Sequence, residues 1–140
     1  MLSNRSIPRA TVIPVIAYRD VNQAAAWLCD AFGFSVRLRI GDHRVQLNVG
    51  DGAVIVRELR PKEIQAELDL GHSVTIRVED ADAHCQRARD HGARITQEPA
   101  NHPYGERQYN AVDLAGHSWT FSQSVADVSP EEWGGTAEQL

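Results

Sequence analysis

The chain has 140 residues, of which 42% are hydrophobic and 24% charged, and its formal net charge is −5 at neutral pH. This length and hydrophobic content suit a single compact domain, and the charge argues against a nucleic-acid partner, because binding phosphates requires a basic face. No stretch approaches the roughly 18 apolar residues of a membrane span, and the first residues lack the apolar run of a secretory signal. We therefore expect a cytoplasmic protein, one domain over residues 1–140, with no nucleic-acid or membrane partner.

The first predicted unit begins with a β-type run at residues 12–18. Asp20 can cap a following helix, apolar residues recur there at helical spacing, and Gly33 can end it. Turn-forming residues then separate three predicted strands, at residues 35–40, 43–49 and 53–59. This order of elements predicts a βαβββ module over about residues 11–60.

The same order recurs about sixty residues later, with Asp80 and Gly92 at the places of Asp20 and Gly33. The predicted elements are a strand at 72–78, a helix at 81–91 and short strands at 94–97, 108–112 and 118–123. A linker at 61–71 can form a short helix or a loop, and residues 126–140 form a tail. We predict an α+β fold in which two tandem βαβββ modules, the second at about 72–125, form a cleft-lining curved mixed sheet with helices outside.

Alternation along the strands predicts which side chains share a face. Val74 and Ile76 should meet the helices, whereas Thr75 and Arg77 should point the other way. The polar face of such a sheet either lines a cleft or is merely solvated, and the pattern alone leaves both readings open.

The segment at residues 104–109, followed by the segment at 113–121, resembles the final hairpin of the vicinal oxygen chelate superfamily. That superfamily includes glyoxalase I, bleomycin resistance proteins and extradiol dioxygenases. Leu114 and Ala115 stand where its turn has Pro and Asp. The resemblance covers roughly residues 11–125, and the tail at 127–133 is similar to the subgroup related to the phosphonate-operon protein. It implies a ligand cleft and pairing into homodimers.

Metal-dependent members of this superfamily place His, Glu or Gln at four inward positions. The equivalent residues here are Ile13, Val56, Ser73 and Thr120. Neither aliphatic side chains nor neutral hydroxyls bind a divalent ion well, so we expect no metal and no cofactor. A register shift of one residue would bring Glu58 or His72 near, which leaves a displaced metal site as the alternative.

The residues expected to bind ligand are polar or aromatic, and several come from the strands that follow each helix. They are Gln46, Thr75, Arg77, His102, Arg107, Tyr109 and Thr120. An arginine fork suits a carboxylate or phosphate, and a tyrosine ring can stack on a flat ligand. The alternatives are salt bridges for Arg77 and Arg107, and core packing for Tyr109.

These observations predict a metal-free homodimer that binds and sequesters a small molecule, similar to the bleomycin resistance proteins. The first alternative is an enzyme, either a metal-dependent glyoxalase or lyase type or a dioxygenase-like member. The second is an interaction module whose cleft is vestigial. No nucleophile with a partnering base is identifiable from the sequence, so no catalytic residue is assigned.

Overall fold

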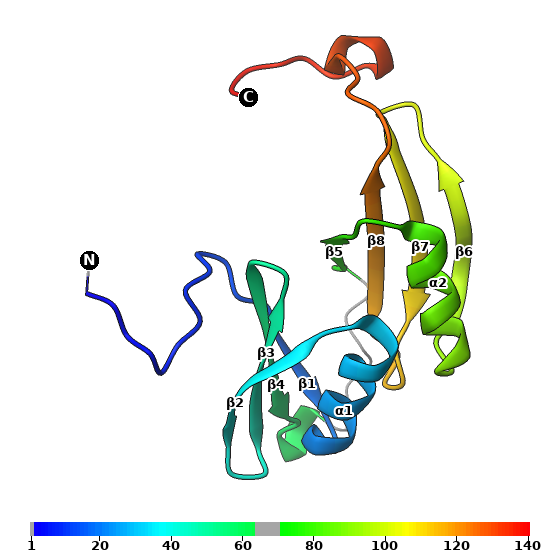
Figure 1. The fold of residues 1–140 in the computed structure, drawn as a ribbon. Helices are drawn as coiled ribbons and strands as arrows, with labels where there is room; N and C mark the ends of the chain where they lie inside the picture. Colours follow the sequence, from blue (N-terminus) through cyan, green and yellow to red (C-terminus); the bar gives the residue numbers. More distant parts are fainter. Residues whose placement is uncertain (1, 64–70) are drawn as a thin grey trace. The chain divides into compact units, whose positions relative to one another are not determined.

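The computed structural model describes residues 2–63 and 71–140 (Figure 1). The chain divides into two compact units, residues 1–69 and 70–140, and the described residues of each form one sheet and one α-helix. The first holds β1 (Val15–Tyr18), α1 (Val21–Phe32), β2 (Ser35–Ile40), β3 (Arg44–Val49) and β4 (Gly52–Glu58). The second holds β5 (Val74–Arg77), α2 (Ala81–Asp90), β6 (Arg94–Asn101), β7 (Glu106–Val112) and β8 (Ser118–Ser124). The α+β class with two tandem βαβββ modules is confirmed; the single-domain organisation stays a prediction.

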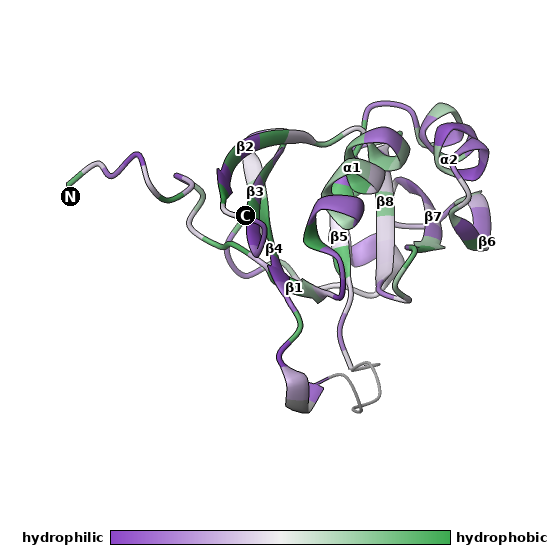
Figure 2. Cartoon of the chain, turned by 90° about the horizontal axis from the view of Figure 1, so that it is seen from below, coloured by the Kyte–Doolittle hydropathy of each residue, from purple (hydrophilic) through white to green (hydrophobic). Residues whose placement is uncertain are grey.

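In module one the strands are ordered β1-β4-β3-β2, with β1 parallel to β4 and the other pairs antiparallel. Helix α1 begins where Asp20 accepts a hydrogen bond from the Gln23 amide at 3.0 Å. It ends at Gly33, whose φ of 81° places it in the left-handed region that glycine adopts readily. Hydrophobic and hydrophilic residues both recur with each helical turn of α1, as the colours in Figure 2 show. Its apolar side packs on β3 and β4, as the sequence pattern predicts.

In module two the strands are ordered β5-β8-β7-β6, with β5 parallel to β8. Helix α2 starts where Asp80 accepts a hydrogen bond from the Ala83 amide at 3.0 Å, and it lies along one face of the sheet (Figure 1). The aromatic side chains of Tyr109, Trp119 and Phe121 form the core beneath it and are at most 1% exposed. Burial of this one apolar face fixes which side of the sheet remains polar.

Strand β6 is longer than expected: it runs to Asn101, whereas the sequence predicts an end at residue 97. Pro99 lies inside it, and proline normally interrupts a strand because it lacks an amide donor. β6 is an edge strand, and its register against β7 shifts between Gln97 and Ala100. The irregular edge accommodates the proline without ending the strand.

The turn between β7 and β8 is organised by the carboxylate of Asp113. Its Oδ1 accepts hydrogen bonds from the amides of Ala115 at 2.9 Å and His117 at 3.0 Å, and its Oδ2 accepts one from the Trp119 indole at 3.0 Å. The side chains of Leu114 and Ala115 take no part in these hydrogen bonds. The turn therefore forms although both residues depart from the pattern of the superfamily that the hairpin resembles.

The linker begins with the 3-10 turn η1 (Pro61–Glu63), and the rest of the predicted linker, residues 64–70, lies outside the described residues. A second 3-10 turn, η2 (Pro130–Trp133), forms in the tail. Within the described ranges, no helix is both long and apolar enough to cross a membrane.

Candidate ligand-binding site

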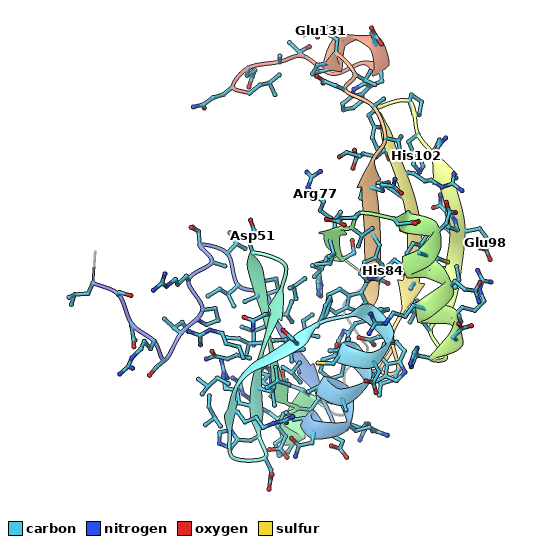
Figure 3. The ribbon with its side chains drawn as sticks, viewed as in Figure 1. Asp51, Arg77, His84, Glu98, His102 and Glu131 are labelled. Carbon is cyan, nitrogen blue, oxygen red and sulfur yellow. The ribbon has the colours of Figure 1, made fainter. Side chains whose placement is uncertain are left out.

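The face of the module-two sheet opposite α2 carries polar side chains on neighbouring strands. Thr75 on β5 lies beside Thr120 on β8, and Arg77 lies beside Ser122, which in turn faces Gln108 on β7. In Figure 3, Arg77 extends from β5 on the side away from α2, whereas His84 belongs to α2 itself. Strand alternation therefore gathers hydrogen-bonding groups on this face, as the sequence predicts for Thr75 and Arg77.

Part of this face is hollowed, with a volume of about 480 Å³. The lining side chains are all polar or can form hydrogen bonds: Thr75, Arg77, Tyr104, Glu106, Gln108 and Ser122. A hollow of this size lies within the range of small-molecule sites.

A chain of hydrogen bonds runs along the floor of the hollow. The Tyr104 hydroxyl donates to Gln108 Oε1 at 2.9 Å, and Gln108 Nε2 donates to Ser122 Oγ at 3.0 Å. Ser122 Oγ then donates to Glu106 Oε1 at 2.6 Å. Every donor in this chain points toward the Glu106 carboxylate, so the network holds the side chains in fixed positions before a ligand binds.

The hollow contains one acidic and one basic side chain. Hydrogen bonding from Ser122, assisted by Ser124 and by the charge of Arg77, lowers the pKa of Glu106 against the effect of burial, so its carboxylate is ionised at neutral pH. Arg77 Nη1 donates to Ser124 Oγ at 2.7 Å. Because a guanidinium carries five N–H donors, this single bond leaves Arg77 able to bind a carboxylate or phosphate.

Two other predicted residues lie near the hollow. Thr120 is next to Thr75, and its Oγ1 donates to Asn110 Oδ1 at 2.8 Å. His102 lies in the turn between β6 and β7 and stacks on Tyr104, with ring centroids 5.1 Å apart and planes 8° from parallel. Its Nε2 is buried and has no hydrogen-bond partner among the described residues. His102 therefore packs against Tyr104, whose hydroxyl begins the chain of hydrogen bonds.

Arg107 and Tyr109 lie on the opposite, helix-covered face, which corrects the expectation that they face the polar side. Arg107 forms a two-pronged salt bridge with Asp82 of α2, at 3.0 and 2.9 Å, and lowers the pKa of that carboxyl. Tyr109 is 0% exposed and hydrogen-bonded to His84, and burial raises the pKa of its phenol. Residues 107 and 109 alternate with 106 and 108, so they belong to the other side of β7.

Gln46 belongs to module one and does not line the hollow. It is 2% exposed, and its amide is hydrogen-bonded to Arg37 and to the backbone oxygen of Ser6. The N-terminal segment thus covers the predicted ligand-binding position.

Four lining residues are absent from the predicted set of ligand-binding residues: Tyr104, Glu106, Gln108 and Ser122. The signal that identifies Glu106 and Gln108 is the alternation of β7 itself, in which Tyr109 and Ala111 are buried. The predicted strand began at residue 108, so the position of Glu106 on the same face was not recognised.

The tail approaches the hollow through Tyr104. The amides of Val125 and Ala126 donate to the Gly105 oxygen at 2.9 and 3.2 Å. Beyond them, the Trp133 ring lies 5.3 Å from Tyr104, centroid to centroid, and the tryptophan remains 46% exposed. The tail therefore adds a third, tilted ring to the pair formed by His102 and Tyr104.

The residues at the family's metal positions do not fit a divalent ion. Val56 lies on the face covered by α1, because its cross-strand neighbours are the buried Ile16 and Val45. The prediction that Val56 faces inward is therefore wrong by one residue, and Ile55 occupies that face instead. Isoleucine, like the aliphatic Ile13, offers no lone pair to a metal.

Acidic and imidazole side chains do not compensate for this. Within residues 2–63 and 71–140, no three His, Cys, Asp or Glu side chains come close enough to hold a metal ion. Glu58 and His72, the candidates for a displaced site, belong to no such group in the described chain. Ser73 and Thr120 supply only neutral hydroxyls, which are poor ligands for a divalent ion.

Comparison with known proteins identifies a family. The sequence model of the Glyoxalase/Bleomycin resistance protein/Dioxygenase superfamily matches residues 9–121. The crystal structure of TioX from Micromonospora sp. ML1 is 34% identical, covers 82% of this chain and 98% of its own, and superposes with a TM-score of 0.67. A comparison with curated proteins gave no significant match.

Two more distant structures share the fold. A glyoxalase/bleomycin resistance protein/dioxygenase family enzyme from Burkholderia phytofirmans PsJN is 15% identical, with a TM-score of 0.69 over 80% of this chain and 96% of its own. A lactoylglutathione lyase from Agrobacterium tumefaciens is 17% identical, with a TM-score of 0.62 over 83% of this chain and 94% of its own.

Proposed function

The chain belongs to the glyoxalase/bleomycin resistance protein/dioxygenase superfamily, and we propose that it binds and sequesters a small molecule in the hollow of module two without using a metal. The observation that supports this proposal most directly is the lining itself. Six polar side chains line it, four of them joined by hydrogen bonds, with one positive and one negative group and with no cysteine or histidine among them. Such a surface is suited to orienting a bound ligand.

The charges of the hollow define the class of ligand. Arg77 can hold a carboxylate or phosphate, and the ionised Glu106 can accept a hydrogen bond from an ammonium or amide group. Thr75 and Gln108 supply neutral polar contacts beside them. We infer a ligand that carries an anionic group together with a hydrogen-bond donor.

We further propose that the protein acts in the cytoplasm as a homodimer. The homodimer is carried over from the resemblance to a superfamily whose members commonly pair, and the half-exposed Trp133 of the tail offers an aromatic surface for such a contact. The similarity of the tail to the phosphonate-operon subgroup stays a prediction from its sequence.

The proposal is tested by binding measurements with two matched arginine variants. A library of small carboxylates and phosphates, with and without amino groups, is screened by thermal shift, and the hits are measured by calorimetry. Arg77→Met should weaken binding of a hit by about tenfold or more, since it removes a charged hydrogen bond. Arg107→Met, on the other face of the same sheet, should leave the affinity unchanged.

Two results would contradict the proposal. One is equal loss of binding in both arginine variants while both melt well above the assay temperature. The other is turnover of a hemithioacetal or related substrate that requires a divalent metal, which would establish the enzymatic alternative. The metal content of protein purified without chelator is measured in parallel.

A further inference from the structure

Module one has a polar site on its own sheet, and the N-terminal turn of the chain covers it. We propose that this is a second binding site, separate from the hollow of module two, and that its ligand class is a compact peptide turn presenting adjacent carbonyl oxygens. Residues 4–7 of the chain occupy it in the structure.

Two side chains hold three successive backbone oxygens. Arg37 Nη2 donates to the oxygens of Arg5 at 2.9 Å and Ile7 at 3.3 Å, and Gln46 Nε2 donates to the oxygen of Ser6 at 2.9 Å. Arg37 Nη1 also donates to Gln46 Oε1 at 2.6 Å, which orients the amide so that its nitrogen faces the peptide. The recognition thus depends on the ligand's backbone.

The bound segment is a turn rather than an extended strand. The amide of Ile7 donates to the Asn4 oxygen at 3.4 Å, and the amide of Ser6 donates to Asn4 Oδ1 at 3.1 Å. An Asn side chain can close a turn by accepting a hydrogen bond from the backbone amide two residues further on. Here this turn brings the backbone oxygens of residues 5–7 toward one side. The shape that fits the site is therefore set by the turn itself.

A β-bulge prepares the site. The register between β2 and β3 shifts between Val36 and Leu38, so Arg37 is the extra residue and leaves the normal alternation. A bulge re-aims the side chain that it inserts, and here the guanidinium reaches Gln46 on the next strand.

The repeat shows why module one needs a ligand at this position. Gln46 lies between Ile55 and Leu38 in the sheet, just as Asn110 lies between Thr120 and Gln97 in module two. Asn110 is satisfied by those two polar neighbours, at 2.8 and 3.0 Å. Ile55 and Leu38 form no side-chain hydrogen bonds, so the Gln46 nitrogen takes its acceptor from outside the sheet.

The turn is held mainly by hydrogen bonds, so it can leave the site. Of residues 2–9, Pro8 is buried and the others are exposed. When residues 2–7 detach, little buried apolar surface therefore becomes exposed to water. Segments with few buried apolar contacts open at low free-energy cost.

The first experiment supplies the turn in trans. A chain lacking residues 2–7 is mixed with an acetylated and amidated peptide of the same residues 2–7, and binding is followed by amide chemical shifts. We expect the peptide to bind with a dissociation constant on the order of millimolar, since a tethered segment has an effective concentration in that range. The peptide should not bind the full chain, whose site is occupied, nor a truncated chain carrying Gln46→Leu. Absence of peptide binding to a truncated chain with a native circular dichroism spectrum would overturn the proposal.

The second experiment uses the full chain and does not depend on the truncation. Trypsin cleaves after Arg5 when the turn detaches, and mass spectrometry follows the product. Arg37→Met should raise the initial cleavage rate by about tenfold, because the guanidinium holds two of the three oxygens.

Arg39→Met is the matched control. Arg39 lies two residues along β2 and donates to Asn22 at 3.1 Å, away from the turn, so its loss should leave the rate unchanged. Equal rates in wild type, Arg37→Met and Arg39→Met would overturn the proposal. Neither result depends on ligand binding in module two.

Discussion

Replacing Ser122 by alanine should break the hydrogen-bonded chain in the hollow at its centre. Ser122 is 5% exposed, and its hydroxyl donates to Glu106 at 2.6 Å and accepts from Gln108 at 3.0 Å. A bond to a charged group contributes about 1.5–3 kcal/mol and a neutral one about 0.5–1.5 kcal/mol. Glu106 and Gln108 are half-buried, so water replaces part of each bond, and the lower values apply. We expect Ser122→Ala to lower the free energy of unfolding by about 2 kcal/mol at pH 7.

Urea unfolding of wild type and Ser122→Ala measures this difference. Ser118→Ala, on the same face at the opposite, exposed end of β8, is the control and is expected to lose less than about 0.5 kcal/mol. The Ser122 hydrogen bond is the largest cause that lowers the pKa of Glu106, so a carboxyl titration by NMR should show this pKa rising in Ser122→Ala. A depressed pKa stabilises the folded state above the unfolded value, so the stability difference should shrink as the pH falls through the carboxyl range. A stability within about 0.5 kcal/mol of wild type, with an unmoved pKa, would refute the reasoning.

Three further predictions concern the framework around the site. Asp113→Ala should cost about 3 kcal/mol in urea unfolding, because it leaves the 1%-exposed Trp119 indole without its acceptor and removes two turn bonds; a loss below about 1 kcal/mol would contradict this. Gly105→Ala should speed hydrogen exchange of the residue 125 amide, since φ is +83° and the new Cβ would lie 2.4 Å from the residue 126 oxygen; unchanged exchange would show that the tail adapts. Hydrogen bonding from Arg57 lowers the pKa of Glu63 to about 2, so stability from this pair is complete above the usual carboxyl range and lost as the pH falls toward 2. Melting temperatures between pH 6 and pH 2.5 should therefore fall less steeply in Arg57→Met than in wild type, and parallel curves would argue against the pair.

The fold was predictable because the helix caps and strand alternation in each module indicate the same order of elements, and this order recurs in the second module. Asp20 and Asp80 cap the two helices as expected, and the alternation of β5 and β8 correctly assigns the face of Thr75. These features depend on residues close together in sequence, where capping and alternation act directly. Strand β6 was underestimated because the cost of Pro99 depends on whether a strand is at an edge, which a local pattern does not contain.

The candidate site was only partly predictable because face assignment requires the strand register. Arg107 and Tyr109 have the chemistry of ligand-binding residues, yet their side chains lie on the face of β7 that contacts α2. The alternate residues, Glu106 and Gln108, lie on the polar face. Gln46 was expected to bind ligand, but it is covered by residues forty positions earlier in the chain, which a local pattern does not indicate. Neither the bulge at Arg37 nor the turn that it holds leaves a recognisable periodic signal.

The pairing of each module's first strand with its last has a consequence for folding kinetics. β1 pairs with β4, and β5 with β8, so both sheets described here are completed within their own half of the chain. Loops of some forty residues close at moderate entropic cost, and low sequence separation between contacts speeds folding. Module one can therefore complete its hydrogen-bonded sheet during synthesis, before the strands of module two have left the ribosome.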